Sequence, residues 1–248
     1  MHNPFTLEGK TLLVTGASSG IGRAVAIECS RAGARVLITA RNEERLRETL
    51  SRMEGDAHTL IAADLSGEED HTRLIACIPA LDGLVHCAGL TRTKLFPFVD
   101  RETLDEVMAV NFTAPALLSA RLVREKKLRK GGSIVFISSI SGSGCVWAGN
   151  AMYSASKGAI NGLMKNMALD LAQKGIRVNS MNPGMVETPI VDAGVITPEQ
   201  LEADKKRYPL KRYGRPEEVA YGVIYLLSGA SAWMTGSALV LDGGYTLL

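Results

Sequence analysis

Short apolar segments that alternate with helical patterns constrain the fold of this 248-residue chain more than any other feature. Seven of them read as strands, at residues 11–15, 35–40, 58–64, 83–88, 133–138, 176–182 and 238–242. They are almost continuously apolar, which is typical of parallel strands covered by helices on both faces. No Pro-, Gly- or Ser-rich linker and no internal repeat interrupts the order. We therefore predict a single α/β domain over residues 1–248, doubly wound around a seven-stranded parallel sheet.

Composition and charge limit the classes of partner. The chain is 46% hydrophobic and 22% charged, as in an ordinary soluble protein. Its 28 basic and 26 acidic side chains indicate neither a nucleic-acid nor a membrane-surface partner. The one dense basic run, residues 121–130, continues a helical pattern, so we interpret it as a solvated helix end. Four scattered cysteines and the lack of a leader-like or bilayer-length apolar segment lead us to expect a cytoplasmic protein with reduced thiols.

Two segments depart from the strand–helix alternation. Residues 186–209 have no strand pattern and too little apolar content for a core, so we interpret them as a mobile substrate flap beside a site. Residues 138–150 are rich in Ser and Gly and directly follow a predicted strand. Because sheets of this kind bind ligands at the carboxyl ends of their strands, the second segment is predicted to line the site.

A glycine-rich turn, TGASSGIG, joins the first predicted strand to a helix and contains Gly16, Gly20 and Gly22. Glycines permit such a tight turn and let backbone N–H groups approach a pyrophosphate at the helix N-terminus. The same residues match the G-x-S-x-G nucleophile elbow of α/β-hydrolases. That motif needs a histidine base near the C-terminus, and the last histidine is His86. We therefore favour a dinucleotide site on a Rossmann fold.

The residue after the second predicted strand bears on the choice of cofactor. An acid at this place indicates NAD, whereas an arginine indicates NADP. The chain has Arg41, whose guanidinium can bind a 2′-phosphate, so NADP(H) is predicted. Alternatively, Arg41 only begins the next helix. Asp64, after the third predicted strand, is expected either to bind the adenine amino group or to cap the next turn.

Tyr153 and Lys157 lie four residues apart and therefore share one face of a predicted helix. A tyrosine exchanges protons poorly at neutral pH because its pKa is about 10. An adjacent ammonium group stabilises the phenolate and lowers that pKa. Such a pair arises by chance in many helices, but this one follows Ser138 and Ser139 at the end of the fifth predicted strand. The combination predicts that Tyr153 is the catalytic acid and base.

These motifs together resemble the short-chain dehydrogenase/reductase family, in the branch of about this length, and most of all its 3-oxoacyl-carrier-protein reductase type. The resemblance covers nearly the whole chain. It is carried by residues 15–22, Asp64, 88–89, Asn111, 138–139, 153–157, 182–184, Thr188, 214–220 and 242–245.

The resemblance implies a role for each matched residue. Tyr153 would donate a proton to the carbonyl oxygen during reduction, and Ser139 would hold that oxygen. Lys157 would bind the nicotinamide ribose and lower the pKa of Tyr153, and Asn111 would anchor a water that relays protons to Lys157. The implied cofactor site consists of Gly16, Ser18, Ser19, Gly20, Ile21, Gly22, Arg41, Asp64, Leu65, Cys87, Ala88, Gly89, Tyr153, Lys157 and a wall around the nicotinamide made by Pro183, Gly184, Val186 and Thr188.

Three departures from the family pattern qualify these expectations. The family usually has NNAG after the fourth strand, whereas this chain has HCAG at residues 86–89, which predicts weaker cofactor binding. Ser19 stands where NADP-using relatives often carry a basic residue, so Arg41 would hold the phosphate largely alone. The interval between the serine and the tyrosine is one residue longer than is common, which leaves Ser138 and Ser141 as alternatives for the serine role.

We therefore expect hydride transfer between NADP(H) and a carbonyl or secondary alcohol, run as reduction. The substrate would be a small molecule or an acyl group on a carrier protein, and an acidic carrier would bind the basic run at residues 121–130. The alternative is an NADP-binding scaffold or sensor with little turnover, which the HCAG departure favours. The resemblance also implies a homotetramer, in which helices beside the site and residues 245–248 pack between subunits.

Overall fold

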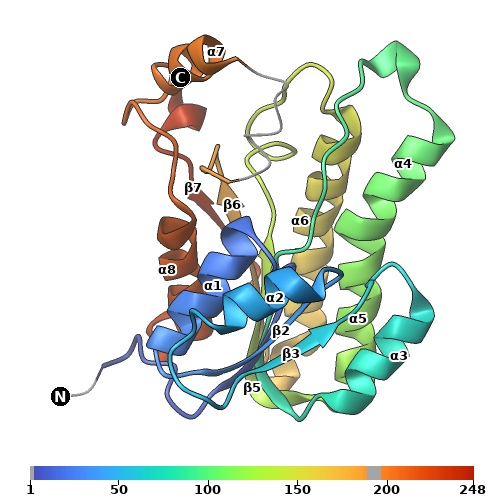
Figure 1. The fold of residues 1–248 in the computed structure, drawn as a ribbon, viewed down its shortest axis with the longest axis vertical. Helices are drawn as coiled ribbons and strands as arrows, with labels where there is room; N and C mark the ends of the chain where they lie inside the picture. Colours follow the sequence, from blue (N-terminus) through green and yellow to red (C-terminus); the bar gives the residue numbers. More distant parts are fainter. Residues whose placement is uncertain (1–2, 189–196) are drawn as a thin grey trace.

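The predicted strands form one parallel seven-stranded sheet (Figure 1). The computed structural model describes residues 3–188 and 197–248. The strands follow the order β3-β2-β1-β4-β5-β6-β7. Their bounds are β1 (Thr11–Thr15), β2 (Arg35–Ala40), β3 (Thr59–Ala62), β4 (Leu81–His86), β5 (Leu128–Ile137), β6 (Arg177–Pro183) and β7 (Ala238–Leu241). The order reverses between β1 and β4, which confirms the predicted doubly wound Rossmann fold.

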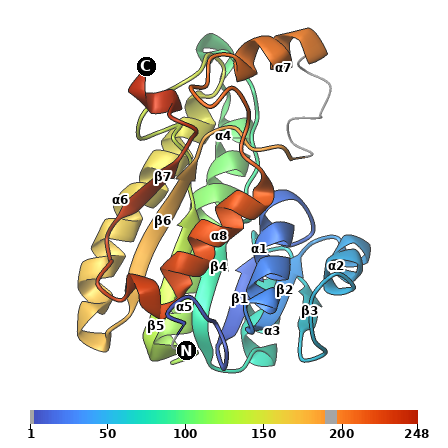
Figure 2. The same ribbon diagram turned by 90° about the vertical axis from the view of Figure 1, so that its left-hand side faces the viewer.

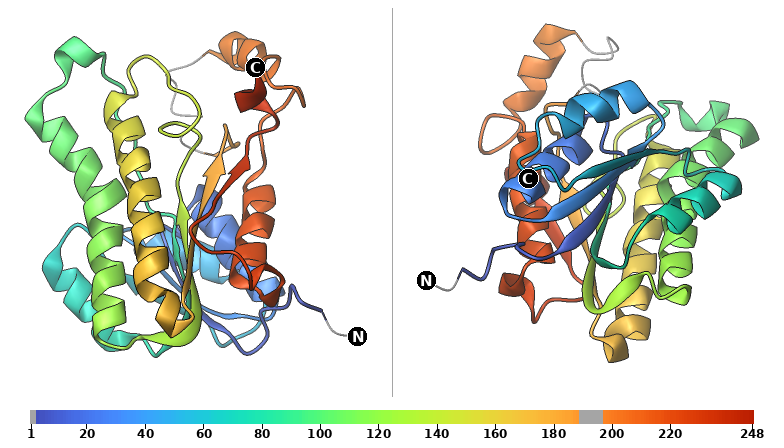
Figure 3. Two further views of the ribbon diagram at one scale, coloured as in Figure 1. Left: turned by 180° about the vertical axis from the view of Figure 1, so that it is seen from behind. Right: turned by 60° about the horizontal axis from the view of Figure 1, so that its bottom comes forward.

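Helices cover both faces of the sheet, as the continuously apolar strands predict. One face packs against α1 (Gly20–Arg31), α2 (Glu43–Leu50) and α8 (Pro216–Leu227) (Figure 2). The other packs against α3 (Glu68–Cys77), α4 (Arg101–Met108), α5 (Ala114–Arg124) and α6 (Ala151–Leu171) (Figure 3). Because successive strand residues face opposite sides, Leu12 and Val14 lie in one core and Leu13 in the other. In the part of the chain that the structure describes, no helix combines the length and apolarity needed to cross a membrane.

β5 begins at Leu128, whereas the apolar pattern predicts a start at Ser133. Leu128 already pairs with β4, and the register then shifts. Between the two registers lies Gly131, whose φ of +80° is a conformation that other residues rarely adopt. The pattern missed this part because its sequence, RKGG, is polar. The basic run at residues 121–130 is consequently only in part a helix end, since α5 stops at Arg124.

The sequence pattern also missed two helical features. The first is α7 (Pro198–Lys205), which lies inside the segment interpreted as a flap. Its start is a capping box, in which the side chains of Thr197 and Gln200 each accept a hydrogen bond from the backbone N–H of the other. The T-P-E-Q sequence was the signal for this helix. The second is a π-helix at Ala109–Thr113, between α4 and α5. The middle of the predicted flap, residues 189–196, lies outside the described residues.

The carboxyl ends of the strands gather the loops that the sequence predicts to be functional. The glycine turn follows β1 and the Ser/Gly-rich segment follows β5. α7 and the C-terminus lie beyond the same edge of the sheet, at the top of Figure 1, whereas the N-terminus lies near the opposite edge.

Candidate active site

The glycine turn after β1 fits tightly against the segment that follows β4. A Cβ atom on Gly16 would lie 2.5 Å from the backbone nitrogen of Ala88, and one on Gly22 would lie 2.3 Å from the Gly16 carbonyl oxygen. The Thr15 hydroxyl accepts hydrogen bonds from the N–H groups of Cys87 and Ala88 at 3.2 and 3.3 Å. The two middle strands are thus joined where the strand order reverses, and a side chain fits at neither glycine.

The N-terminus of α1 presents backbone N–H groups that suit an anion. Its N-cap residue, Ser19, makes no side-chain capping bond, and the first turn, which begins with Gly20 and Ile21, holds no acidic residue. The two carbonyl oxygens before Ser19 accept hydrogen bonds from the Thr49 hydroxyl at 2.9 Å and from the Arg23 guanidinium at 2.6 Å. Because these carbonyls are held by side chains of α2 and α1, the turn offers donors rather than acceptors. This arrangement fits the pyrophosphate of a dinucleotide.

The residues predicted to bind the adenosine half lie after β2 and β3. Arg41 is exposed, and Asn42 is the residue that caps α2, by accepting a bond from an N–H of its first turn at 2.9 Å. Arg41 is therefore not needed to begin that helix. Asp64 Oδ1 accepts bonds from the N–H and the hydroxyl of Ser66 at 3.0 and 2.7 Å, and these bonds hold the pKa of Asp64 below its usual value. Asp64 thus caps the turn that contains Leu65, as one of the two interpretations predicted.

Tyr153, Lys157 and Ser139 come together at the end of β5 and the start of α6. The Lys157 ammonium lies 5.5 Å from the centre of the Tyr153 ring and donates a hydrogen bond to the Ile137 carbonyl at 2.8 Å. Burial raises the pKa of Tyr153, and the Ser139 hydroxyl, which interacts with the phenol, lowers it by a smaller amount. Burial also lowers the pKa of Lys157 to about 8.

The pKa of Tyr153 lies above its ordinary value, so the net effect of its surroundings is opposite in direction to the effect expected of Lys157. The ammonium contacts the face of the ring and a backbone carbonyl. In a buried phenol the cost of desolvating the phenolate then dominates. Tyr153 and Lys157 lie together as the sequence predicts, but burial is the largest cause of the pKa shift of each.

Ser139 is the candidate serine that interacts with Tyr153. The Ser138 hydroxyl instead donates to a backbone carbonyl of α6 at 3.1 Å. The Ser141 hydroxyl lies 2.7 Å from that of Ser154, and both Ser138 and Ser141 are fully buried. Ser139 Oγ is held from the other side by the N–H of Ser141 at 3.0 Å. The hydroxyls of both alternatives thus have other partners, whereas that of Ser139 lowers the pKa of Tyr153, which favours Ser139.

Asn111 occupies the π-helix, a feature often found at functional sites. Its Nδ2 donates to the Leu90 carbonyl at 2.9 Å and to the Ser156 hydroxyl at 3.0 Å, while its Oδ1 accepts from the Leu90 N–H at 2.8 Å. A Cβ on Gly89 would lie 3.4 Å from Asn111 Oδ1 and 3.5 Å from Lys157 Nζ. Asn111 therefore lies in the neighbourhood of Lys157, as predicted. Because the protein uses both of its amide protons, a water held here would bind an oxygen of Asn111.

The predicted nicotinamide wall follows directly from the end of β6 at Pro183. Val186 is buried and forms a β-bridge with Gly214. Thr188 lies beside the glycine turn, since a Cβ on Gly20 would lie 3.3 Å from its methyl carbon. The wall thus reaches from β6 to the start of α1.

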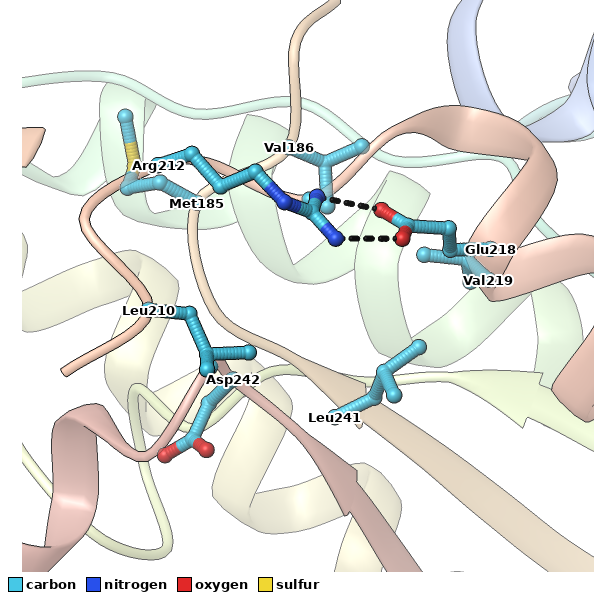
Figure 4. Close-up of a pocket in the computed structure, with 10 residues that line it drawn as sticks. Met185, Val186, Leu210, Arg212, Glu218, Val219, Leu241 and Asp242 are labelled. Atoms are coloured by element: carbon cyan, nitrogen blue, oxygen red, sulfur yellow. Dashed lines mark hydrogen bonds and ion pairs between the residues drawn. The ribbon is translucent and has the colours of Figure 1, made fainter. Parts of the chain in front are cut away.

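A pocket lies beside this wall (Figure 4). The ion pair between Arg212 and Glu218 borders it, with a shortest separation of 2.6 Å. None of the candidate catalytic residues lines it, so it is separate from the Tyr153 site. Its lining consists of Met185, Val186, Leu210, Arg212, Gly214, Glu218, Val219, Leu241, Asp242 and Gly243.

The HCAG segment places its histidine in the core. The His86 ring stacks on Phe136 with centres 4.8 Å apart, and its Nε2 lies 2.8 Å from the Ser119 hydroxyl of α5. Burial lowers the pKa of His86 to about 3. Cys87 faces the glycine turn, because its Cβ would lie 3.1 Å from a Cβ on Gly22. His86 therefore braces β4 against α5, whereas Cys87 borders the cofactor site.

Replacing His86 by asparagine is expected to make the protein less sensitive to acid. A histidine in an unfolded chain has a pKa of about 6.5, whereas folding holds that of His86 at about 3. As the pH falls, the unfolded state therefore gains a proton first. Relative to the variant, the wild type should keep its full free energy of unfolding above pH 6.5. Below that pH it should lose up to about 1.4 kcal/mol of it per pH unit. Urea unfolding of both proteins at pH 7 and pH 5 measures the effect, and equal losses would contradict it.

The fold and the site together define the class of protein. A doubly wound sheet with a glycine turn at its reversal point binds a dinucleotide. The serine, tyrosine and lysine beside that turn can place a proton on a substrate oxygen. The chain is a nicotinamide-dependent oxidoreductase that acts on carbonyl or alcohol groups.

Comparison with known proteins supports the assignment to nicotinamide-dependent oxidoreductases. The family model described as enoyl-(acyl carrier protein) reductase matches residues 16–246. The chain is 35% identical to 3-oxoacyl-(acyl-carrier-protein) reductase FabG of Rickettsia bellii, over 98% of this chain and 99% of the relative. It is 38% identical to glucose 1-dehydrogenase of Gluconobacter oxydans, over 96% and 92%.

Solved structures match the chain at a level of sequence identity close to that of these relatives. The NADP active-site complex of Pseudomonas aeruginosa RhlG has a TM-score of 0.91 at 33% identity, over 99% of this chain and 100% of that chain. A dehydrogenase/reductase of Sinorhizobium meliloti has a TM-score of 0.89 at 35% identity, over 98% and 97%. The chain belongs to the short-chain dehydrogenase/reductase family.

Proposed function

We propose that this enzyme reduces a carbonyl group to a secondary alcohol with NADPH as the hydride donor. The observation that carries the proposal is the cluster of Tyr153, Lys157 and Ser139 beside the glycine turn. When bound, a reduced nicotinamide supplies a hydride to the carbonyl carbon. Purified protein should consume NADPH when a suitable carbonyl compound is added. A broad panel of ketones, aldehydes and thioesters that leaves NADPH unchanged would contradict the proposal.

The three side chains have separate tasks in this reaction. The Tyr153 hydroxyl donates its proton to the substrate oxygen as negative charge develops there. The Ser139 hydroxyl, which interacts with the phenol, holds the same oxygen in place. Lys157, with a pKa of about 8, still carries its charge at neutral pH and stabilises the phenolate after the proton has left.

We propose a substrate with an apolar chain, such as an acyl group on a carrier protein. The relatives named FabG are reductases of this kind. The Lys94 N–H donates to the Gly149 carbonyl at 2.9 Å, which ties the segment after β4 to the loop before Tyr153. Just beyond this tie, Phe96 and Phe98 are 77% and 68% exposed. Such exposed apolar groups favour an acyl chain over a sugar. Faster NADP-dependent oxidation of glucose than reduction of a 3-oxoacyl thioester would reverse this choice.

The Arg41→Ala variant is expected to bind NADPH about tenfold more weakly or worse, because a charge-assisted bond to the 2′-phosphate is lost. The affinity for NADH, which lacks that phosphate, should hardly change. Fluorescence titration of both cofactors measures the ratio. Arg47→Ala is the control, since Arg47 is an exposed arginine on α2 that already pairs with Glu43. Equal losses for the two cofactors would refute a phosphate contact of Arg41.

We also propose a homotetramer in the cytoplasm. Leu117 of α5 and Leu169 of α6 are 57% and 77% exposed, and Leu247 and Leu248 at the C-terminus are 85% and 87% exposed. Exposed apolar side chains in such numbers support an interface. The four cysteines are free thiols, which supports a reducing compartment. Light scattering of the purified protein tests the tetramer, and a monomer would contradict it.

A scaffold or sensor with little turnover is the second candidate, because of the HCAG departure. The position of His86 in the core weakens this argument, since that residue leaves the Tyr153 cluster intact. Tight NADPH binding without consumption on the carbonyl panel would favour the sensor.

A further inference from the structure

α6 carries a third buried polar residue in line with Tyr153 and Lys157. Asn161 follows Lys157 by four residues, as Lys157 follows Tyr153, so the three share one face of the helix. Asn161 Oδ1 accepts a hydrogen bond from the Ser180 hydroxyl of β6 at 2.9 Å. Its Nδ2 is buried, and nothing in residues 3–188 and 197–248 accepts from it. Buried donors in proteins are nearly always paired, so this atom points to an acceptor.

β6 holds the complementary atom. Asn182 lies two residues beyond Ser180, so both side chains face the same side of the strand, and both are fully buried. Asn182 Nδ2 donates to the Ser143 hydroxyl at 3.2 Å. Asn182 Oδ1 is buried and receives no hydrogen bond from the part of the chain that the structure describes. An unpaired donor and an unpaired acceptor thus lie on facing elements.

Ser143 fixes the orientation of the Asn182 amide. A hydroxyl has a single proton, and Ser143 directs it at the carbonyls of Ser139 and Ile140, 3.3 and 3.5 Å away. The Ser143 oxygen must then accept from its other neighbour, so the NH₂ end of Asn182 faces Ser143. The oxygen end is left for a donor. The same contacts connect Asn182, through one hydroxyl, to the backbone of Ser139.

We propose that one buried water bridges Asn161 and Asn182, accepting from Nδ2 of the first and donating to Oδ1 of the second. The water joins the helix that carries Tyr153 and Lys157 to the loop that carries Ser139. Asn161 and Asn182 are therefore positioning residues, which hold Ser139 at its distance from Tyr153. This positioning role rests on the proposed function, whereas the water site does not.

Diffraction tests the water without any assay of activity. A high-resolution crystal structure of the wild-type protein should show one ordered water about 3 Å from both Asn161 Nδ2 and Asn182 Oδ1. A direct bond between the two amides, or an empty space between them, would overturn the proposal. If the wild type reduces no carbonyl compound, the proposed function fails, but the diffraction experiment still shows whether the water between Asn161 and Asn182 exists.

Kinetics test the positioning role. Asn161→Ala and Asn182→Ala should each lower kcat about tenfold, because a misplaced catalytic group loses its alignment, while the Kd for NADPH stays within about twofold. The double variant should be no slower than the slower single variant, since either substitution removes the same bridge. Asn166→Ala is the control, because Asn166 is an exposed residue of α6 whose side chain bonds the Gly162 carbonyl of its own helix. The proposal would be overturned if the two single losses in kcat multiply in the double variant. It would also be overturned if the single variants keep the kcat of Asn166→Ala.

Ser143→Ala covers the case in which an asparagine variant fails to fold. It deletes one hydroxyl from a loop and leaves both asparagines in place. We expect a lower kcat in a variant that still folds, because the substitution removes the link to the Ser139 carbonyl together with the acceptor of Asn182 Nδ2. An unchanged kcat in this folded variant would contradict the connection between Asn182 and Ser139.

Discussion

The Tyr153→Phe variant is expected to lose about three orders of magnitude in kcat for carbonyl reduction, within the range that a positioned general acid contributes. The substitution deletes the hydroxyl and keeps the ring, so the packing of Lys157 against that ring, 5.5 Å from its centre, is retained. The Kd for NADPH should therefore change by less than about twofold. Steady-state kinetics with a responsive carbonyl substrate, together with a fluorescence titration of NADPH, measure the two quantities.

Tyr221→Phe is the matched control for this variant. Tyr221 lies on α8, which covers the opposite face of the sheet, and it is 55% exposed. The same deletion of a hydroxyl there should leave kcat unchanged. Full activity of Tyr153→Phe would refute the role of Tyr153 as proton donor. A parallel loss of NADPH binding and turnover would assign its hydroxyl to cofactor binding instead.

The Gly16→Ala variant is expected to lose about 3 kcal/mol or more of stability, and with it the binding of NADPH. Gly16 has a φ of +66°, which strains a residue with a side chain. The new Cβ would also lie 2.5 Å from the nitrogen and 2.7 Å from the Cα of Ala88. The backbone atoms of Ala88, just beyond the end of β4, cannot turn aside as a side chain can, so the glycine turn and the segment after β4 must separate. Thermal unfolding without cofactor and a titration with NADPH measure both effects.

Gly162→Ala provides the opposite outcome for the same change of residue. Gly162 lies inside α6, and a Cβ there would meet no atom within 4 Å. Alanine favours the helix, so this variant should gain about 0.5–1 kcal/mol. A Gly16→Ala variant that is as stable as the wild type would disprove the tight contact with Ala88. A loss of stability in Gly162→Ala would remove the clash as the explanation.

Features that depend on residues close together in the sequence could be predicted from the sequence alone. The continuously apolar segments predicted the strands, and the spacing of Tyr153 and Lys157 predicted a shared helix face. The start of β5 escaped prediction because its first residues are polar and are held in place by pairing with β4. The HCAG departure was expected to weaken cofactor binding, and the sequence did not show that the ring of its His86 packs on Phe136 in the core. Nothing local distinguishes a histidine that faces a helix from one that faces a cofactor.

By itself, the sequence determined the parallel sheet, the glycine turn after β1 and the pairing of Tyr153 with Lys157, because periodicity and turn chemistry act over a few residues. Only the tertiary structure showed that the hydroxyls of Ser138 and Ser141 bond other partners, which favours Ser139 as the serine beside Tyr153. Only it showed that the pKa of Tyr153 is raised. Both results depend on which groups are buried together when β5 and α6 pack, and burial is a property of the whole fold.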